Sequence, residues 1–284
     1  MYARCNITLW LSLFGFAALS TPANCSAQAQ WEFGLGLATL YLPDYRGAEQ
    51  AQGYLLPIPY IRYQGDRFNV DEDGIRGKLF ATDRAELDLS LAAGLPVNDE
   101  KNTARSGMPD LDPTLEFGPA LHAKLGSSED DHRRLWLKLP LRTVISVNTS
   151  AIDQQGWVFA PYLEYEIEKR ENRMRRSELS ISVGPLYADD RYHQYYYGVA
   201  PEFGTADRAP YEAGGGYSGS RITLTWTRRH DKWWIGAFMR YDNLSGATFE
   251  DSPLVKDRNY LAVGIALARI LSQSQNNSSD PGRP

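Results

Sequence analysis

Four histidines are the side chains of this chain best suited to acid–base chemistry near neutral pH: His122, His132, His193 and His230. No two of them lie at a metal-ligand spacing, and none has that spacing to a pair of acids, so we expect no metal site. His193 lies among tyrosines, and a serine such as Ser218 could pair with it as the nucleophile of an ester hydrolase. Nothing in the sequence brings these two together, so we expect no catalytic residue and no enzyme.

Three glutamates, Glu164, Glu166 and Glu168, alternate with apolar residues and therefore share one face of a predicted strand. Such a row can form a cation-selective constriction in a pore. It can also form a solvated wall whose carboxylates pair with arginine and lysine of neighbouring strands. We favour the wall.

Two further groups of side chains could bind a ligand. The consecutive tyrosines 195–197 could stack on one, but we favour a role in an aromatic girdle and in filling the interior. Asp110, Asp112 and Asp251 lie in polar segments and could hold calcium, but their spacing lacks the tight ligand pattern of a calcium loop. We therefore expect no metal-binding residue, no cofactor-binding residue and no cofactor.

The strand predicted over residues 232–242 indicates how side chains are positioned in this chain. Successive residues of a strand point to opposite faces. One face here is apolar with an aromatic residue at each end, and it holds Trp233, Ile235, Ala237, Met239 and Tyr241. The opposite face mixes small, aromatic and charged residues. This pattern is typical of a strand that faces lipid between two aromatic girdles, although a half-buried strand of a soluble sandwich has the same alternation.

About twelve segments of ~10 residues follow this period of two, which is the length that a tilted strand needs to cross a bilayer. In chain order they are residues 31–42, 53–63, 67–81, 85–95, 114–125, 134–147, 157–169, 175–187, 193–200, 217–228, 232–242 and 260–271. Pro57 and Pro59 each remove a ladder hydrogen bond, so we expect the second segment to be irregular or weakly paired. Gly74 and Gly77 interrupt the third, which we expect to be one bulged strand or two short ones.

These segments, with charged residues kept opposite leucine, predict an all-β fold: an antiparallel transmembrane β-barrel of about 12 strands (10–14). Alternation alone does not tell whether the apolar face points into a soluble barrel or out to lipid. A signal peptide, the aromatics at segment ends and the number of segments favour the membrane. His122 is then an inner-face residue with a structural role. Because both termini of an even-stranded barrel are periplasmic, the polar segments 201–216 and 243–257 are expected outside the cell.

Residues 1–29 have the pattern of a cleaved signal peptide. Arg4 is their only charge, and the apolar run 7–19 is too short to span a bilayer. Ala27-Gln28-Ala29 is a small-x-small cleavage site. Lipidation of Cys25 is disfavoured, because residues 22–24 match a lipidation site poorly. We therefore expect a barrel over residues 30–271 and a polar, disordered tail over residues 272–284.

Composition narrows the partners. Both cysteines, Cys5 and Cys25, lie in the predicted signal peptide, which excludes disulfides and thiolate metal sites from the rest of the chain. The formal net charge is −5, and removal of Arg4 makes it −6, so we expect no nucleic-acid partner. A mean hydropathy of −0.44 does not exclude a membrane protein, because every second residue of a barrel strand is polar or small.

Several long stretches carry a family resemblance. They are Gly-Met-Pro-Asp-Leu-Asp-Pro-Thr-Leu-Glu-Phe-Gly-Pro at 107–119, Arg-Tyr-His-Gln-Tyr-Tyr-Tyr-Gly-Val-Ala-Pro at 191–201, Tyr-Glu-Ala-Gly-Gly-Gly-Tyr-Ser-Gly at 211–219, Arg-Tyr-Asp-Asn-Leu-Ser-Gly-Ala at 240–247, Asp-Ser-Pro-Leu-Val at 251–255 and Leu-Pro-Asp-Tyr-Arg-Gly at 42–47. With these stretches, nearly the whole chain after residue 29 resembles the MipA/OmpV family of outer-membrane proteins, the MltA-interacting protein family. Members commonly end in an aromatic residue that the assembly machinery reads, whereas the last predicted strand here ends at Leu271 and a polar tail follows.

The resemblance implies a barrel in the outer membrane of a Gram-negative bacterium, in contact with membrane lipid. It also implies a non-enzymatic scaffold, since the family's named member is held to link a murein transglycosylase to a peptidoglycan synthase. Other members are similar to porins or to adhesive surface proteins, so a pore or an adhesin remains the alternative, with a lipid hydrolase as a third possibility. The family offers no catalytic residue to carry over.

Overall fold

The computed structural model describes residues 30–65, 68–71, 74–77, 80–82, 84–130, 132–148, 151–172 and 174–274. The predicted signal peptide, residues 1–29, and residues 275–284 of the predicted tail lie outside this range. In the described part of the chain, no helix is both long and apolar enough to cross a membrane.

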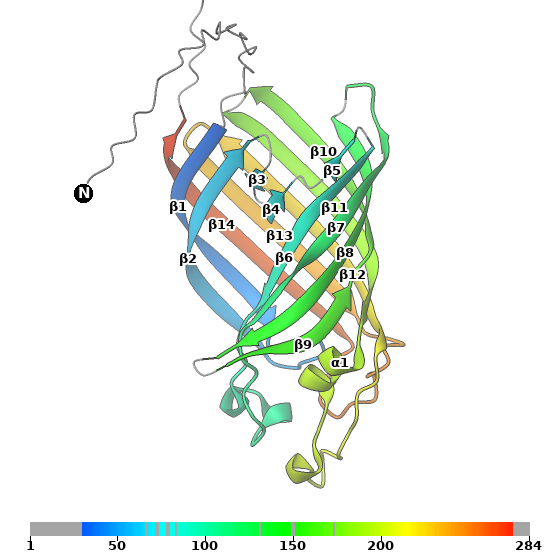
Figure 1. Cartoon of the computed structure of the whole chain (residues 1–284). Helices are drawn as coiled ribbons and strands as arrows, with labels where there is room; N and C mark the ends of the chain where they lie inside the picture. Colours follow the sequence, from blue (N-terminus) through cyan, green and yellow to red (C-terminus); the bar gives the residue numbers. More distant parts are fainter. Residues whose placement is uncertain are drawn as a thin grey trace, which may run out of the picture.

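Strands make up most of the described chain. The long ones are β1 (Gln30–Pro43), β2 (Ala51–Gln64), β6 (Ala85–Gly94), β7 (Thr114–Ser127), β8 (Arg133–Val147), β9 (Ile152–Phe159), β10 (Tyr162–Asn172), β11 (Arg175–Ala188), β12 (Gly216–His230), β13 (Trp233–Asn243) and β14 (Asn259–Gln273). Three short strands, β3 (Phe68–Asp71), β4 (Gly74–Gly77) and β5 (Phe80–Ala81), follow β2. All belong to one antiparallel 14-stranded sheet, in which β1 pairs with both β2 and β14. The tilted strands wind around a common axis as a barrel (Figure 1).

The outer face of the barrel is apolar. On β1, the side chains of Trp31, Phe33, Leu35, Leu37 and Tyr41 are 40–56% exposed. Large apolar side chains exposed on other strands include Leu89, Leu91, Leu115, Phe117, Leu121, Leu141, Leu163, Ile181, Val183, Ile222, Leu224, Met239, Leu261, Ile265 and Leu267. A soluble barrel would bury this face, so its outward position is that of a barrel whose solvent is lipid.

The inner face is polar, and many of its charged groups are paired. Buried polar side chains on the strands include Glu32, Asp88, Lys138, Glu166, Arg229 and Asp242. Ion pairs on this face join residues of different strands. They include Arg229 with Glu32, Lys138 with Glu164, Arg134 with Glu166 (3.1 Å) and Glu168 (3.3 Å), and Arg142 with Glu116 (2.9 Å). The predicted glutamate row on β10 is therefore a wall that is paired with arginine and lysine of β8.

One predicted strand was wrong. Residues 193–200 lie mostly in a helix, α1 (Asp190–Tyr197). The carboxylate of Asp189 accepts a hydrogen bond from the backbone N–H of Tyr192 at 3.0 Å and so caps the helix. The same oxygen accepts from the N–H of Trp157 at 3.1 Å, which ties the helix start to β9. A Cβ on Gly156, whose φ is +111°, would collide with this carboxylate, so glycine is required there.

Four other segments differ from their predictions. The strand predicted at 157–169 is divided at Pro161, which cannot donate to a ladder, into β9 and β10; both pair with β8 and β11. The described parts of 67–81 form three short strands. β2 pairs with β1 over 14 consecutive positions despite its two prolines, and its described pairing on the other side involves only Tyr63 and Gln64. β14 extends to Gln273, two residues beyond the predicted end.

The outward position of Ala237 generates a first prediction. Ala237 lies on β13 midway between Trp233 and Tyr241, so an arginine there should face the bilayer interior. We expect Ala237→Arg to destabilise the barrel by ~2–4 kcal/mol or to block its assembly. The yield of refolding into lipid vesicles, read from the shift in gel mobility on heating, measures this.

The matched control carries the same new side chain at the same depth on the inner face. Ala266 of β14 follows Ile265, which pairs with Ala237, so its side chain points to the opposite face of the sheet. Ala266→Arg should refold with a yield close to that of the wild type. Equal yields for Ala237→Arg and the wild type would contradict the assignment of this face to lipid.

Candidate functional site

The four long loops at the barrel end away from Gln30 and Gln273 pack together, and we call them the loop cap (Figure 1). They are residues 44–50, 95–113, 189–215 and 244–258. Their shared apolar cluster comprises Tyr45, Ala48, Val97, Ala104, Met108, Leu111, Tyr197, Val199, Ala213, Leu244, Ala247, Phe249 and Leu254. Bacterial outer-membrane barrels have long extracellular loops and short periplasmic turns, so we expect the loop cap at the cell surface.

Aromatic and guanidinium groups fix the loop cap. Tyr197 of α1 stacks on Phe249 with ring centroids 3.6 Å apart and planes within 7°. Buried Arg208 donates hydrogen bonds to the carbonyls of Ala104 (2.9 Å) and Ser106 (3.0 Å), which joins two loops. The tyrosines at 195–197 therefore pack within the cap and fill the space between loops, in keeping with the filling role predicted for them.

His193 of α1 and Ser218 of β12 lie side by side. Nε2 of His193 is 2.6 Å from Oγ of Ser218, and Nδ1 is 2.7 Å from the carbonyl oxygen of Gly214. A carbonyl accepts only, so Nδ1 carries the proton and Nε2 accepts from the serine hydroxyl. Sequence reasoning singled out these two residues but gave no reason for them to meet, because the contact depends on α1 folding back against the start of β12.

Burial decides what this pair can do. His193 is 0% exposed and Ser218 is 1% exposed, and the ring of Phe249 lies 4.6 Å from the imidazole. A carbonyl, rather than a carboxylate, orients the imidazole. Burial lowers the pKa of His193, and Arg46 lowers it further, whereas the hydrogen bond to Gly214 opposes this. The imidazole is thus held neutral and shielded from any substrate, and it connects the loop cap to the barrel wall.

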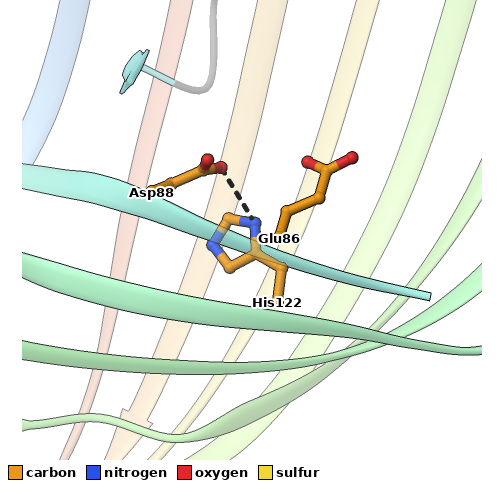
Figure 2. Close-up of side chains that lie close together, drawn as sticks. All are labelled: Glu86, Asp88 and His122. Atoms are coloured by element: carbon orange, nitrogen blue, oxygen red, sulfur yellow. Dashed lines mark ion pairs between the residues drawn. The ribbon is translucent and has the colours of Figure 1, made fainter. Parts of the chain in front are cut away.

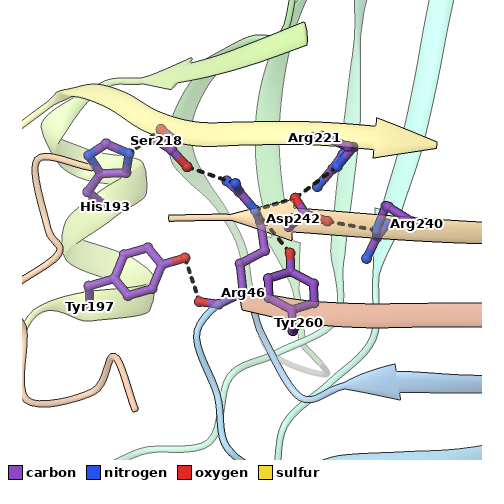
Figure 3. A network of polar contacts seen from close by, with 8 residues as sticks. All are labelled: Arg46, His193, Tyr197, Ser218, Arg221, Arg240, Asp242 and Tyr260. Atoms are coloured by element: carbon purple, nitrogen blue, oxygen red, sulfur yellow. Dashed lines mark hydrogen bonds and ion pairs between the residues drawn. The ribbon is translucent and has the colours of Figure 1, made fainter. Parts of the chain in front are cut away.

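A second polar network adjoins this pair (Figure 3). The carboxylate of Asp242, which is fully buried, contacts the Nε atoms of Arg46 (3.0 Å), Arg221 (3.0 Å) and Arg240 (3.2 Å). Arg46 also donates to the hydroxyl of Tyr260 at 3.1 Å. Arg46 belongs to the loop cap. Its NH2 group donates to the carbonyl of Ser218 at the start of β12, and its own carbonyl accepts from Tyr197 of α1. Stretches 42–47, 191–201, 211–219 and 240–247 thus meet at this network.

Three potential metal ligands also meet on the inner wall: Glu86 and Asp88 of β6 and His122 of β7 (Figure 2). The register sets Glu86 opposite His122, and Nδ1 of His122 lies 3.3 Å from Oδ2 of Asp88. The three ligand atoms lie within 4.8 Å of one another, whereas two ligands of a tetrahedral zinc ion lie about 3.4 Å apart. The three ligand atoms would have to move closer together to hold an ion. The contact between His122 and Asp88 gives His122 a structural role.

The remaining sequence candidates do not form a site in the described part of the chain. His230 is the last residue of β12 and lies 3.6 Å from the carboxylate of Asp231. His132 is exposed just before β8. The side chain of Asp112 accepts a hydrogen bond from Asn148 at 3.1 Å, and among the described residues it does not cluster with Asp110 and Asp251.

Comparison with known proteins places this geometry in a family. The profile of the family described as MltA-interacting protein MipA matches residues 35–270. The chain belongs to the MipA family. It is 33% identical over 248 residues to the outer membrane protein OmpV of Vibrio cholerae, and the aligned region covers 85% of this chain and 86% of that protein. It is 33% identical over 213 residues to the outer membrane protein Omp26La of Vibrio anguillarum, covering 72% of this chain and 74% of that protein.

Among solved structures, a FadL homologue of Pseudomonas aeruginosa is similar with a TM-score of 0.32 and 11% identity, covering 84% of this chain and 67% of that chain. The resemblance to the MipA/OmpV family is confirmed, and so is the location. This MipA-family chain is a β-barrel protein in the outer membrane of a Gram-negative bacterium.

The buried imidazole generates a pH prediction. Because the pKa of His193 is lowered in the fold, the unfolded chain binds a proton more readily. The stability that His193 contributes is complete above its unfolded pKa of ~6.5 and is lost as the pH falls through that value. We expect cleavage of the loop cap by an added protease to accelerate between pH 7.5 and pH 5, and we expect His193→Gln to flatten this dependence.

His230 provides the control, because it is an exposed histidine at the opposite end of the barrel. His230→Gln should keep the pH dependence of the wild type. If the dependence is unchanged in His193→Gln, or is lost in His230→Gln, then His193 does not control the loop cap.

Proposed function

We propose that this MipA-family barrel is a non-enzymatic interaction protein, which holds a murein transglycosylase and a peptidoglycan synthase at the inner surface of the outer membrane. The observation that carries the proposal is the family match over residues 35–270, since that family is described by its interaction with another protein. The burial of His193 and Ser218 where the loop cap meets β12 supports a function without catalysis by this pair.

The proposed docking surface is the barrel end that bears Gln30 and Gln273. Its connections after β7, β10 and β12 are short, and short turns of such barrels face the periplasm. Exposed basic side chains gather at this end: Arg133, Lys169, Arg170, Arg175, Arg228, Lys232 and Arg269. Among the described residues, the exposed acids near them are Glu129, Asp130 and Glu171, and Asp231 pairs with Arg175 at 3.5 Å. This excess of positive charge favours a partner with an acidic surface, and it predicts that association weakens as salt rises.

Charge reversal tests both the partner and the docking end. The full chain, reconstituted in lipid, is crosslinked to a murein transglycosylase and a peptidoglycan synthase in solution. We expect the triple change Arg133→Glu, Arg170→Glu and Lys232→Glu to abolish the crosslinks, because it replaces attraction with repulsion.

A triple change at the opposite end is the control: Lys101→Glu, Arg191→Glu and Lys256→Glu, all at exposed positions of the loop cap. It should leave the crosslinks unchanged. If the wild type crosslinks to neither enzyme, the interaction function is wrong. If the two triple variants behave alike, the docking end is wrong.

A pore for small solutes is the second candidate. Two adjoining internal cavities of about 270 and 250 Å³ below the loop cap favour it. The apolar cluster of the cap opposes it, because that cluster joins the four loops at one end of the barrel. We expect folded protein in a planar bilayer to give no conductance steps. Reproducible steps from protein that passes the heat-shift test for folding would establish the pore instead.

A further inference from the structure

Arginine side chains line the space below the loop cap. The cavity of about 270 Å³ is lined by Arg46, Arg142, Arg221 and Arg240. The cavity of about 250 Å³ shares Arg142 and Arg221 with it, so the two adjoin, and we call them the arginine chamber. Their volumes lie near the lower end of the range for small-molecule sites.

The positive charge of the chamber exceeds the negative charge that contacts it. Arg46, Arg221 and Arg240 share the single carboxylate of Asp242. Three guanidinium groups around one carboxylate leave an excess of two positive charges on the inner wall, where the arginine side chains are only 12–30% exposed. Such charges are normally compensated by a counter-charge or a ligand.

The other acids of the chamber are already paired. Glu116 pairs with Arg142 at 2.9 Å, and Glu164 pairs with Lys138. Asp44, at the side of the loop cap, accepts hydrogen bonds from the side-chain amides of Gln52 (2.6 Å) and Asn102 (2.8 Å). Even with the charge of Asp44 counted, the arginines around Asp242 retain a positive excess.

Two of these arginines have donors to spare. Arg221 of β12 and Arg240 of β13 flank Asp242 on neighbouring strands and contact it through Nε (Figure 3). Each guanidinium has five N–H donors. Within the described part of the chain, the terminal NH1 and NH2 groups of both residues contact no protein acceptor. Paired N–H donors of this kind match the two oxygens of a planar carboxylate.

Aromatic rings provide the rest of the lining. Tyr54, Tyr192, Tyr196, Phe238 and Tyr260 line the same cavity as the four arginines. Rings of this kind accommodate a flat or apolar body, while the arginines hold a charged head. The combination describes an amphipathic small molecule with an anionic end, in preference to a bare inorganic ion.

We propose that the arginine chamber binds a small organic carboxylate, whose carboxylate accepts hydrogen bonds from Arg221 and Arg240 and whose body packs on the tyrosines. This binding function is additional to the interaction with cell-wall enzymes and does not depend on it. Removal of one guanidinium leaves Asp242 with two arginine partners, so the site can be weakened while the barrel is kept.

Calorimetric titration of the full chain in detergent tests the proposal. Benzoate is the probe, benzamide is its neutral isostere, and inorganic phosphate represents an anion without an apolar body. We expect benzoate to bind, the other two to bind at least about tenfold more weakly, and Arg240→Gln to weaken benzoate binding at least about tenfold. Arg228→Gln changes an exposed arginine at the other end of the barrel and should leave the affinity unchanged.

The heat-shift gel shows that each variant is folded before it is titrated, and Arg221→Gln serves as a second variant if Arg240→Gln does not fold. The proposal is overturned if benzoate gives no saturable heat, or if benzamide binds equally well. It is also overturned if the affinity survives in the folded arginine variant. Phosphate binding without benzoate binding would make the chamber a site for inorganic anions and would equally refute the carboxylate assignment.

Discussion

The barrel depends on one constraint: inside a bilayer there is no water to satisfy a backbone N–H or C=O group, so the strands must satisfy one another. The chain meets it with a single antiparallel sheet, in which β1 pairs with both β2 and β14. Lipid then takes the place of a core for the outward side chains, and Leu35 and Leu37 are exposed for that reason. Polar side chains at the same depth are consequently confined to the interior.

The confinement of polar side chains to the interior explains why charged groups are paired there. A buried charge without a partner is costly, and the inner wall accordingly contains pairs such as Arg229 with Glu32 and Arg134 with Glu166. The loop cap completes the interior at one end, where His193 and Arg46 connect its loops to the strands. At Asp242, three arginines share one carboxylate, and the resulting excess of positive charge gives the interior its strongest potential for binding a ligand.

The sequence predicted the fold well and the contacts poorly, for physical reasons. A period of two, as in Trp233 to Tyr241, identifies a strand and its two faces, but the pattern is the same whether the apolar face points inward or outward. A strand was predicted where α1 lies, because the tyrosine-rich segment stands between other predicted strands. Asp189 and Asp190 are nevertheless a signal for the start of a helix. The pairing of His193 with Ser218 depends on loop packing, which spacing along the chain does not reveal.

Cysteine scanning of β13 tests the central claim, that one face of each strand lies in lipid, most directly. Residues 30–284 contain no cysteine, so single cysteines can be placed in turn at positions 233–242 of a chain that begins at residue 30. The reconstituted variants are treated with a lipid-soluble maleimide or a charged, water-soluble one. We predict that positions 233, 235, 237, 239 and 241 react with the lipid-soluble reagent and that the alternate positions resist it. Equal reactivity of adjacent positions towards both reagents would contradict the outward apolar face.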